Sequence, residues 1–180
     1  MIFDSEQDWF SHNIPNWISI ITEPEKIESI VEIGNWEGRS TIWLADYCVN
    51  AKITTIDPSH NLQNRQRLLQ NVAEHPRSSS IDIKFGFSEN ELQRISYNSA
   101  DLIYIDGSHE AKDVLLDGLM CYKIVKTGGI IIFDDYAVGD EQRIKCDFIK
   151  RPAIGIDAFL SVIDCEIIHK GWQIIVRKPL

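Results

Sequence analysis

The chain has few cysteines, and none of them are paired at a metal-binding spacing. Its four cysteines lie far apart and form no C-x-x-C motif: Cys48, Cys121, Cys146 and Cys165. Zinc sites usually draw on cysteines two residues apart, and disulfide frameworks belong to small cysteine-rich domains. We therefore expect neither, and we expect the thiols to be reduced and mostly buried.

Long hydrophobic runs are also missing. Nowhere do some twenty apolar residues follow one another, which is the length that a membrane-spanning helix needs. The N-terminus lacks the basic segment and apolar core that mark an export signal. The sequence therefore predicts a cytoplasmic protein that does not bind membranes.

Positive charge is scarce, because 18 lysines and arginines stand against 27 acidic residues and give a net charge of −9. Such a chain repels a phosphate backbone, so nucleic acid is not expected as a partner, whereas small molecules or neutral sugars are. The 180 residues, 44% of them hydrophobic, predict one domain over 1–180. This domain can also be a module of a longer chain, and the oligomeric state stays open, a homodimer included.

The stretch S-I-V-E-I-G-N-W-E-G-R-S-T at residues 29–41 predicts a strand, a tight loop and a helix. Its apolar residues are mostly β-branched, Gly34 permits the turn, and Gly38 lets the following helix pack closely. The free N–H groups at such a helix start favour anionic or hydroxyl-rich ligands. The glycines are spaced G-x-x-x-G, whereas NAD-binding proteins need G-x-G-x-x-G, which argues against NAD.

A second strand, at residues 52–57, ends in Asp57, 23 residues beyond Gly34. A carboxylate at the tip of a neighbouring parallel strand can accept hydrogen bonds from both hydroxyls of a ribose, which NAD and S-adenosylmethionine both carry. The alternative is that Asp57 merely caps the turn at Pro58 and Ser59. We expect the ribose role.

The remaining patterns predict an alternation of helices and continuous apolar strands, typical of a parallel sheet covered on both faces. Helices are expected at 40–47, 61–73, 110–125 and 153–163, and strands at 81–86, 102–105, 130–133, 165–169 and 172–177. The last two strands form an antiparallel hairpin. Residues 1–28 are predicted to be a helical cap with two short helices interrupted at Pro15. It covers one edge of the sheet, or else places Trp9, Phe10 or His12 over a ligand.

Four acids stand at predicted strand ends: Asp57, Asp106, Asp134 and Asp135. The carboxyl ends of parallel strands share one crevice, so these side chains should converge. Crowded carboxylates repel one another unless a cation or a proton stabilises them, and oxygen ligands suit Mg²⁺, Ca²⁺ or Mn²⁺. The alternative is that Asp134 and Asp135 cap a loop and face water.

Several motifs resemble those of class I S-adenosylmethionine-dependent methyltransferases. Glu32 before G-x-x-x-G resembles their first motif. I-D-G-S-H at 105–109, Asp117, K-T-G-G-I-I-I-F-D-D-Y at 126–136 and I-D-A-F-L at 156–160 are similar to small bacterial members that include macrocin-type sugar O-methyltransferases. The likeness spans residues 31–178. It implies a Rossmann-like α/β fold with a mostly parallel seven-stranded sheet, an antiparallel C-terminal hairpin and helices on both faces.

The resemblance also implies a set of site residues. S-adenosylmethionine would be bound by Glu32, Gly34, Asn35, Gly38, Ser40, Asp57, Gly86, Phe87, Ser88 and Asp106, and a divalent cation, Mg²⁺ or Mn²⁺, by Asp106, Asp134 and Asp135. Asp106 or His109 would take the proton from a hydroxyl of a sugar, a glycan or another small molecule. Ala111 departs from the pattern, since many relatives carry an aromatic residue there, and this leaves the acceptor open.

Residues 137–152 form a polar insertion that contains Arg143, Lys145, Lys150 and Arg151. We expect a lid over the acceptor that attracts an anionic or phosphate-linked sugar; the alternative is a solvated loop. Two other functions stay open besides the O-methyltransferase: a non-catalytic S-adenosylmethionine-fold binding module and a nucleotide-linked oxidoreductase. The oxidoreductase is the weaker of these because the sequence lacks G-x-G-x-x-G.

Overall fold

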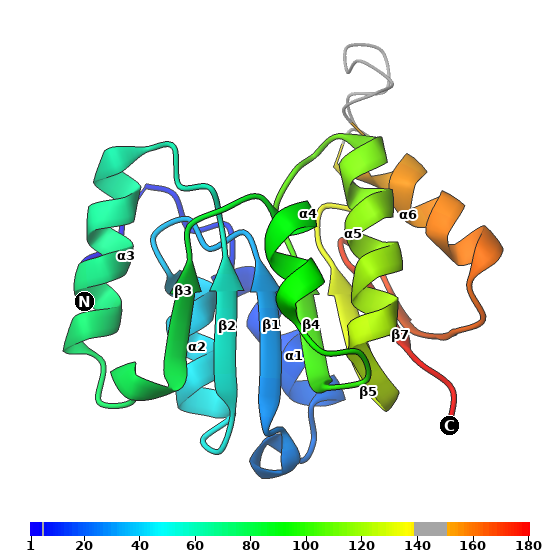
Figure 1. Cartoon of the computed structure of the whole chain (residues 1–180), viewed down its shortest axis with the longest axis horizontal. Coiled ribbons are helices and arrows are strands. Elements are labelled where there is room, and N and C mark those ends of the chain that lie inside the picture. Colours follow the sequence, from blue (N-terminus) through cyan, green and yellow to red (C-terminus); the bar gives the residue numbers. More distant parts are fainter. Residues whose placement is uncertain (5, 139–150) are drawn as a thin grey trace.

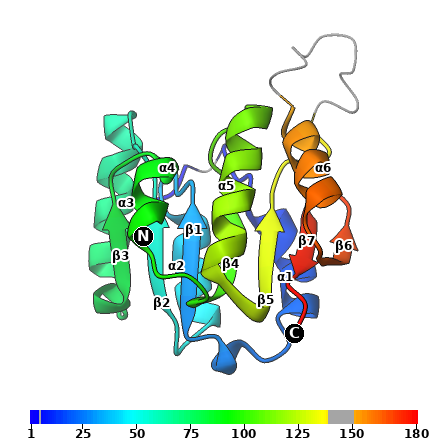
Figure 2. The ribbon, with the colours of Figure 1, turned by 45° about the vertical axis from the view of Figure 1, so that its right-hand side comes forward.

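The computed structural model describes residues 1–4, 6–138 and 151–180. Seven strands in this part of the chain form one sheet. They are β1 (Ser29–Ile33), β2 (Lys52–Ile56), β3 (Ile81–Lys84), β4 (Ala100–Ile105), β5 (Val125–Phe133), β6 (Glu166–Lys170) and β7 (Ile174–Arg177). Figure 1 shows this sheet from one of its faces, and Figure 2 also labels the edge strand β6. The predicted seven-stranded sheet is confirmed.

The strand order is β3-β2-β1-β4-β5-β7-β6. The first five strands pair in parallel, whereas β7 pairs antiparallel with both β5 and β6. The order of the strands reverses between β1 and β4, because β2 and β3 are added on one side of β1 and β4 and β5 on the other. At such a switch point the loops that follow the strands diverge and leave a crevice. The C-terminal hairpin is therefore as predicted, with its last strand inserted inside the sheet.

Helices cover both faces of the sheet, as Figures 1 and 2 show. They are α1 (Ile14–Ile20), α2 (Arg39–Tyr47), α3 (Leu62–Glu74), α4 (Ser88–Glu91), α5 (Ala111–Ile124) and α6 (Pro152–Val162). Side chains of α1, α2 and α3 share one hydrophobic cluster with the sheet, and those of α5 and α6 share the other. The fold is a Rossmann-like, three-layer α/β arrangement.

The two clusters follow from the alternation of side chains along each strand. In β4, Leu102 and Tyr104 face α1 and α2, whereas Ile103 and Ile105 face α5. All four are at most 4% exposed. Full burial of one such aliphatic side chain stabilises the fold by about 1.5–3 kcal/mol, which explains why the central strands are apolar on both faces.

The N-terminal segment differs from the prediction. The described residues before Ser11, 1–4 and 6–10, form no helix. Pro15 lies in the first turn of α1, where a proline is tolerated because the first helical N–H groups have no partner. Helix α1 covers a face of the sheet and not its edge, since the indole of Trp17 packs against the ring of Tyr104 at 4.7 Å. The expected edge cap is therefore wrong.

The predicted lid at 137–152 falls mostly on residues 139–150, which lie outside the described residues, as do Arg143, Lys145 and Lys150. Among the described helices, none combines the length and the apolar character that crossing a membrane requires. Cys48 and Cys121 are buried and Cys165 is half-buried, all as free thiols.

Candidate functional site

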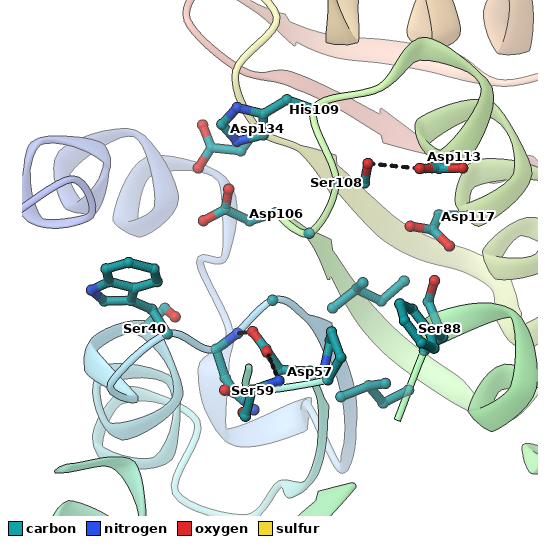
Figure 3. Close-up of a pocket in the computed structure, with 18 of the residues that line it drawn as sticks. Ser40, Asp57, Ser59, Ser88, Asp106, Ser108, His109, Asp113, Asp117 and Asp134 are labelled. Atoms are coloured by element: carbon teal, nitrogen blue, oxygen red, sulfur yellow. Dashed lines mark hydrogen bonds between the residues drawn. The ribbon is translucent and has the colours of Figure 1, made fainter. Parts of the chain in front are cut away.

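A cavity of about 1000 Å³ opens at the carboxyl ends of the parallel strands. The loops that follow β1, β2 and β4 line it, together with the start of α4, the first turns of α5 and an N-terminal segment. Figure 3 shows Asp57 and Ser59 on one side of this space and Asp106, His109 and Asp134 on another. Its volume is typical of a site for a small molecule.

The loop after β1 requires its two glycines. Gly34 has φ +85° and Gly38 has φ +86°, backbone conformations that glycine adopts without a steric penalty. A Cβ on Gly34 would lie 1.9 Å from the carbonyl oxygen of Asp106, so the β1 and β4 tips touch directly. A Cβ on Gly38 would lie 2.8 Å from Leu68 of α3, as the predicted close helix packing demands.

Glu32 supports this loop from inside the protein. Its carboxylate is 0% exposed and accepts hydrogen bonds from the hydroxyls of Ser40 at 2.5 Å, Thr41 at 2.5 Å and Thr55 at 2.6 Å. Burial raises its pKa against the effect of these three bonds. Glu32 is outside the cavity lining, and its bonds join the β1 tip to the start of α2 and to β2.

Asp57 is held in the cavity by the backbone. The N–H of Asn35 donates to its Oδ2 at 3.1 Å, and the N–H of Ser59 donates to its Oδ1 at 2.5 Å. Each carboxylate oxygen keeps a lone pair for a further donor. The Asn35 side chain also lines the cavity, is 2% exposed, and its amide nitrogen and oxygen have no hydrogen-bond partner among the described residues.

A second part of the lining lies beyond Asp57, between the start of α4 and α5. Phe87 is 55% exposed and Ser88 follows it, as expected from the sequence. Gly86 is outside the lining and donates its N–H to the carbonyl of Asp57. Figure 3 places Asp117 beside Ser88, and burial raises the pKa of Asp117 to about 6.

Asp134 differs from the other strand-tip acids because the protein itself saturates it. Its Oδ2 accepts bonds from Gln173 at 3.0 Å and from Asn13 at 3.4 Å, and the Tyr104 hydroxyl also bonds to it. The N–H of Asp135 donates to its Oδ1 at 2.8 Å. Asp134 is 7% exposed, and its bonds tie β5 to α1 and to the chain just before β7.

Three other side chains form a group that fits a metal ion. Each of Asp106, His109 and Asp135 offers one ligand atom, and these atoms lie within 4.8 Å of one another. Nε2 of His109 lies 2.8 Å from Oδ2 of Asp135. The structure therefore groups Asp106 and Asp135 as the sequence predicts, but with His109 where the prediction has Asp134.

The carboxylates in this corner of the cavity change the pKa values of one another and of His109. Burial, and then the charges of Asp134 and Asp135, raise the pKa of Asp106 well above its ordinary value. Burial is also the main cause of the raised pKa of Asp134. The hydrogen bond to Asp135 raises the pKa of His109. A cation among these groups would relieve the repulsion, so their donor set, two carboxylates and an imidazole, fits a divalent metal.

Two tryptophans line the cavity: Trp36, which the sequence analysis did not select, and Trp9, which it named only in the alternative that the N-terminal segment lies over a ligand. Trp36 has φ +44°, a rare conformation for a bulky residue, and is 44% exposed. Trp9 is 62% exposed, and its ring centroid lies 5.4 Å from that of Trp36. Of the four described non-glycine residues with positive φ, Trp36, Ser59 and Asp135 all line the cavity. Such strain clusters at functional sites, but no sequence pattern reveals it.

Most of the expected residues meet in this one cavity. Those that line it are Gly34, Asn35, Ser40, Asp57, Phe87, Ser88, Asp106, His109, Asp134 and Asp135, whereas Glu32, Gly38 and Gly86 support it from behind. The lining also includes Asn64, Lys112, Asp113 and Leu116, which the sequence analysis did not select. These four stand on helix faces without a motif.

Structures of similar shape include two O-methyltransferases with bound ligands. The O-methyltransferase from Bacillus cereus, in complex with SAH, has a TM-score of 0.71 at 19% identity. The superposition covers 97% of this chain and 84% of the Bacillus cereus chain. TomG from Streptomyces achromogenes, involved in tomaymycin synthesis and in complex with SAM, has a TM-score of 0.72 at 15% identity. That superposition covers 93% of this chain and 81% of the TomG chain. At these identities the likeness concerns the fold.

Sequence comparison finds one curated relative, an uncharacterized protein of Acanthamoeba polyphaga mimivirus, 30% identical over 121 residues. The match covers 59% of this chain, and the chain spans about half the length (50%) of that relative. The methyltransferase-domain family matches residues 31–136, from β1 through the acids after β5. This match takes in the glycine loop, Asp57, Asp106, His109 and the Asp134-Asp135 pair, and the chain therefore belongs to the methyltransferase-domain family.

Proposed function

We propose that this chain is an S-adenosylmethionine-dependent O-methyltransferase that acts in the cytoplasm as a domain over 1–180. The chain belongs to the methyltransferase-domain family, and the supporting observation is that one cavity contains two kinds of site. Asp57 can bind a ribose, and the group of Asp106, His109 and Asp135 can bind a metal ion. The first site suits the cofactor, and the second suits a hydroxyl acceptor.

Cofactor binding is proposed for the part of the cavity around Asp57, where hydrogen-bond acceptors remain free. Asp57 keeps a free lone pair on each oxygen for the two ribose hydroxyls. Asn35, which the family resemblance assigns to the cofactor, lines the cavity beside Asp57 and donates its backbone N–H to it. Phe87, exposed beside Ser88, offers a flat apolar face to the adenine ring. These contacts hold the donor methyl group in a fixed place, and such positioning is the main contribution of a protein to methyl transfer.

For the cation we propose Asp106, His109 and Asp135 as the residues that hold Mg²⁺ or Mn²⁺. A bound divalent ion lowers the pKa of a coordinated hydroxyl and orients it for methyl transfer. Asp134 serves as the support of this group, because Tyr104 links it to Asp106 and its other oxygen receives the backbone N–H of Asp135. The ligand set expected from the family resemblance, Asp106, Asp134 and Asp135, is the alternative that mutagenesis separates.

Removal of the acceptor proton falls to the same corner of the cavity. With the cation held by Asp106, His109 and Asp135, the proton would go to the carboxylate of Asp106, because the ring nitrogen of His109 is used for the metal. With the alternative ligand set, Asp106, Asp134 and Asp135, His109 would take the proton, and its bond to Asp135 would keep the ring oriented and more basic. The acceptor is a hydroxyl of a sugar, a glycan or another small molecule that reaches this corner.

Calorimetry with S-adenosylmethionine, S-adenosylhomocysteine and NAD tests the proposal. We expect the first two ligands to bind with 1:1 stoichiometry and NAD not to bind. SAH release is then measured with Mg²⁺ against a panel of glycosides and catechols. NAD binding alone would identify an oxidoreductase, and cofactor binding without turnover on any acceptor would favour the non-catalytic binding module. Turnover that persists in excess chelator would refute the cation.

A further inference from the structure

The N-terminal strap, residues 1–4 and 6–10, forms one wall of the cavity. Gln7, Trp9 and Phe10 of this strap line the cavity beside the loop that follows β1. The strap has no helix of its own, so its position depends on contacts with the rest of the domain. It lies outside the residues that match the methyltransferase-domain family, 31–136.

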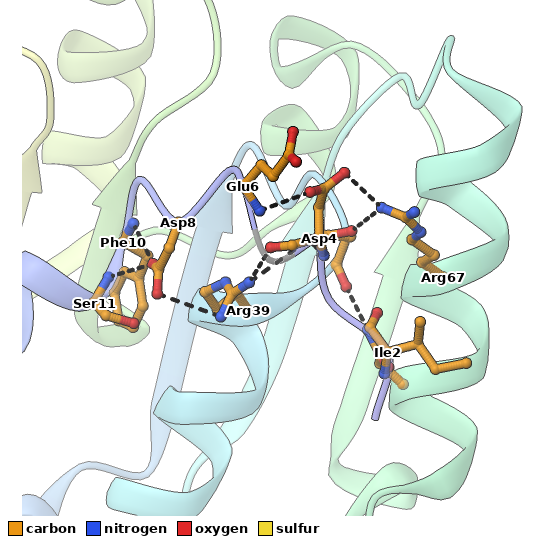
Figure 4. A network of polar contacts seen from close by, with 10 residues as sticks. Ile2, Asp4, Glu6, Asp8, Phe10, Ser11, Arg39 and Arg67 are labelled. Atoms are coloured by element: carbon orange, nitrogen blue, oxygen red, sulfur yellow. Dashed lines mark hydrogen bonds and ion pairs between the residues drawn. The ribbon is translucent and has the colours of Figure 1, made fainter.

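A polar network fixes the strap, as Figure 4 shows. Glu37, 1% exposed, accepts the Asp4 N–H at 2.7 Å and pairs with Arg67 of α3 at 2.9 Å. Arg39 of α2 donates to the Asp4 carbonyl at 2.9 Å and lies 3.4 Å from the carboxylate of Asp8. Glu37 belongs to the same glycine loop as Trp36, so one network holds both the strap and the loop.

The consequence is that two indoles from distant parts of the chain are held together at the cavity. Their ring centroids lie 5.4 Å apart with a tilt of 52° between the planes, and Trp9 is 62% and Trp36 44% exposed. Trp36 holds this position with φ +44°, a backbone conformation that is unusual for a bulky residue. Two exposed tryptophans in a cavity provide a surface for the face of a ring.

The charges of the cavity limit what this ring can be. Its lining carries the carboxylates of Glu37, Asp57, Glu89, Asp106, Asp113, Asp117, Asp134 and Asp135. The cations of the lining are few, Arg39 and Lys112, and Arg39 is engaged by the strap. An anionic group beside the indoles would be repelled, whereas an uncharged ring would not.

We propose that Trp9 and Trp36 form the acceptor subsite of the enzyme and stack against an uncharged, hydroxyl-bearing ring. This inference rests on the proposed function, because the ring must present its hydroxyl to the corner that contains Asp106 and His109. The ring chemistry is shared by a pyranose, whose C–H face stacks on indoles, and by a catechol, whose π-face does.

The test uses the whole chain loaded with S-adenosylhomocysteine and Mg²⁺, and two probes, methyl α-D-glucopyranoside and catechol. Saturation-transfer NMR measures which ring receives magnetisation from the protein, and titration gives its affinity. We expect one probe to bind, which identifies the source of the ring. Trp9→Leu and Trp36→Leu should each weaken that probe on the order of tenfold. The affinity for S-adenosylhomocysteine should change less than threefold.

Two further variants guard against trivial results. Trp36→Gly suits the positive φ and removes the indole without strain, so it should reproduce the loss with a fully folded protein. Trp172→Leu removes an indole of equal exposure, 44%, that lies outside the cavity lining, and should leave probe binding unchanged.

Probe binding that is absent, or equal in wild type and the Trp9 and Trp36 variants, overturns the acceptor subsite. A tenfold loss of S-adenosylhomocysteine affinity in these variants also overturns it, because the indoles would then belong to the cofactor site. If the wild type fails to bind S-adenosylhomocysteine at all, the proposed function itself has failed.

Discussion

The imidazole Nε2 of His109 lies 2.8 Å from Oδ2 of Asp135, although one residue follows β4 and the other follows β5. The two strands are parallel neighbours, so their carboxyl ends bring both side chains to one corner of the cavity. Asp134, adjacent to Asp135 in the chain, is bonded to Tyr104 and Gln173.

This arrangement predicts which residues respond to a metal. Mn²⁺ at a hundred times its dissociation constant should stabilise the wild type by about 2.7 kcal/mol, measured by thermal unfolding. Asp106→Asn, His109→Ala and Asp135→Asn should lose most of this gain, whereas Asp134→Asn should keep it. In chelator, Asp135→Asn should melt higher than the wild type, since the Asp135 charge contributes to the raised pKa of Asp106. Loss in Asp134→Asn with retention in His109→Ala would instead support the ligand set Asp106, Asp134 and Asp135.

The cofactor contact predicted for Asp57 is tested by Asp57→Asn. The variant replaces a charged acceptor with a neutral one, so S-adenosylhomocysteine should bind more weakly by about 1–3 kcal/mol in calorimetry. The fold should survive, because the new side-chain oxygen still accepts one of the two backbone N–H groups. Asp82→Asn, on the exposed side of β3, is the matched control and should bind like the wild type. Unchanged affinity in Asp57→Asn would remove this residue from the cofactor site.

Replacing Glu32 should lower the stability of the fold even when no ligand is bound. Glu32→Ala leaves the hydroxyls of Ser40, Thr41 and Thr55 without their buried acceptor, so the free energy of unfolding should fall by about 3 kcal/mol or more. Glu32→Gln keeps one carbonyl acceptor and the volume, so its loss should be smaller. Chemical denaturation measures both values. Equal stability of Glu32→Ala and the wild type would contradict the proposed support of the loop.

Because of Asp117, we expect the free energy of unfolding to fall as the pH rises from 4 to about 6. Burial raises its pKa from 3.8 to about 6 in the folded protein, so the folded state binds a proton more tightly than the unfolded state. Its contribution to stability is complete below pH 4 and is lost as the pH rises to about 6, a change of roughly 3 kcal/mol at most. Asp117→Asn should therefore be more stable than the wild type at pH 7.5 and not at pH 4. Parallel stability curves of the two proteins across this range would refute the prediction.

The layout of the fold was readable from the sequence because its signals are local and repeated. Continuous apolar runs such as 102–105 and 130–133, separated by helical periodicity, indicate parallel strands, and all of these strands are present. Pro15 misled the interpretation of the N-terminus, since a proline inside a helix and one in its first turn give the same letter in a sequence. The position of α1 on the sheet face depends on Trp17 meeting Tyr104, a contact between distant residues.

The site was predictable where a side chain stands at a strand end, as Asp57, Asp106 and Asp135 do. It was not predictable where neighbours decide the role of a residue. Asp134 and Asp135 are adjacent acids, yet only the structure reveals that Gln173, 39 positions away, bonds to Asp134. Trp36 was hidden for another reason, because the positive φ that directs its indole depends on loop geometry and not on residue type.

Gln173 accepts the indole N–H of Trp17 at 2.7 Å and donates to Asp134 at 3.0 Å, immediately before β7 inserts between β5 and β6. During synthesis β5 leaves the ribosome well before β7, so for a time β5 is an open sheet edge and Asp134 has no bond from Gln173. The full set of bonds to Asp134 therefore forms only after the last strand has docked, and nascent chains that end before residue 173 should expose the β5 edge and depend on chaperones.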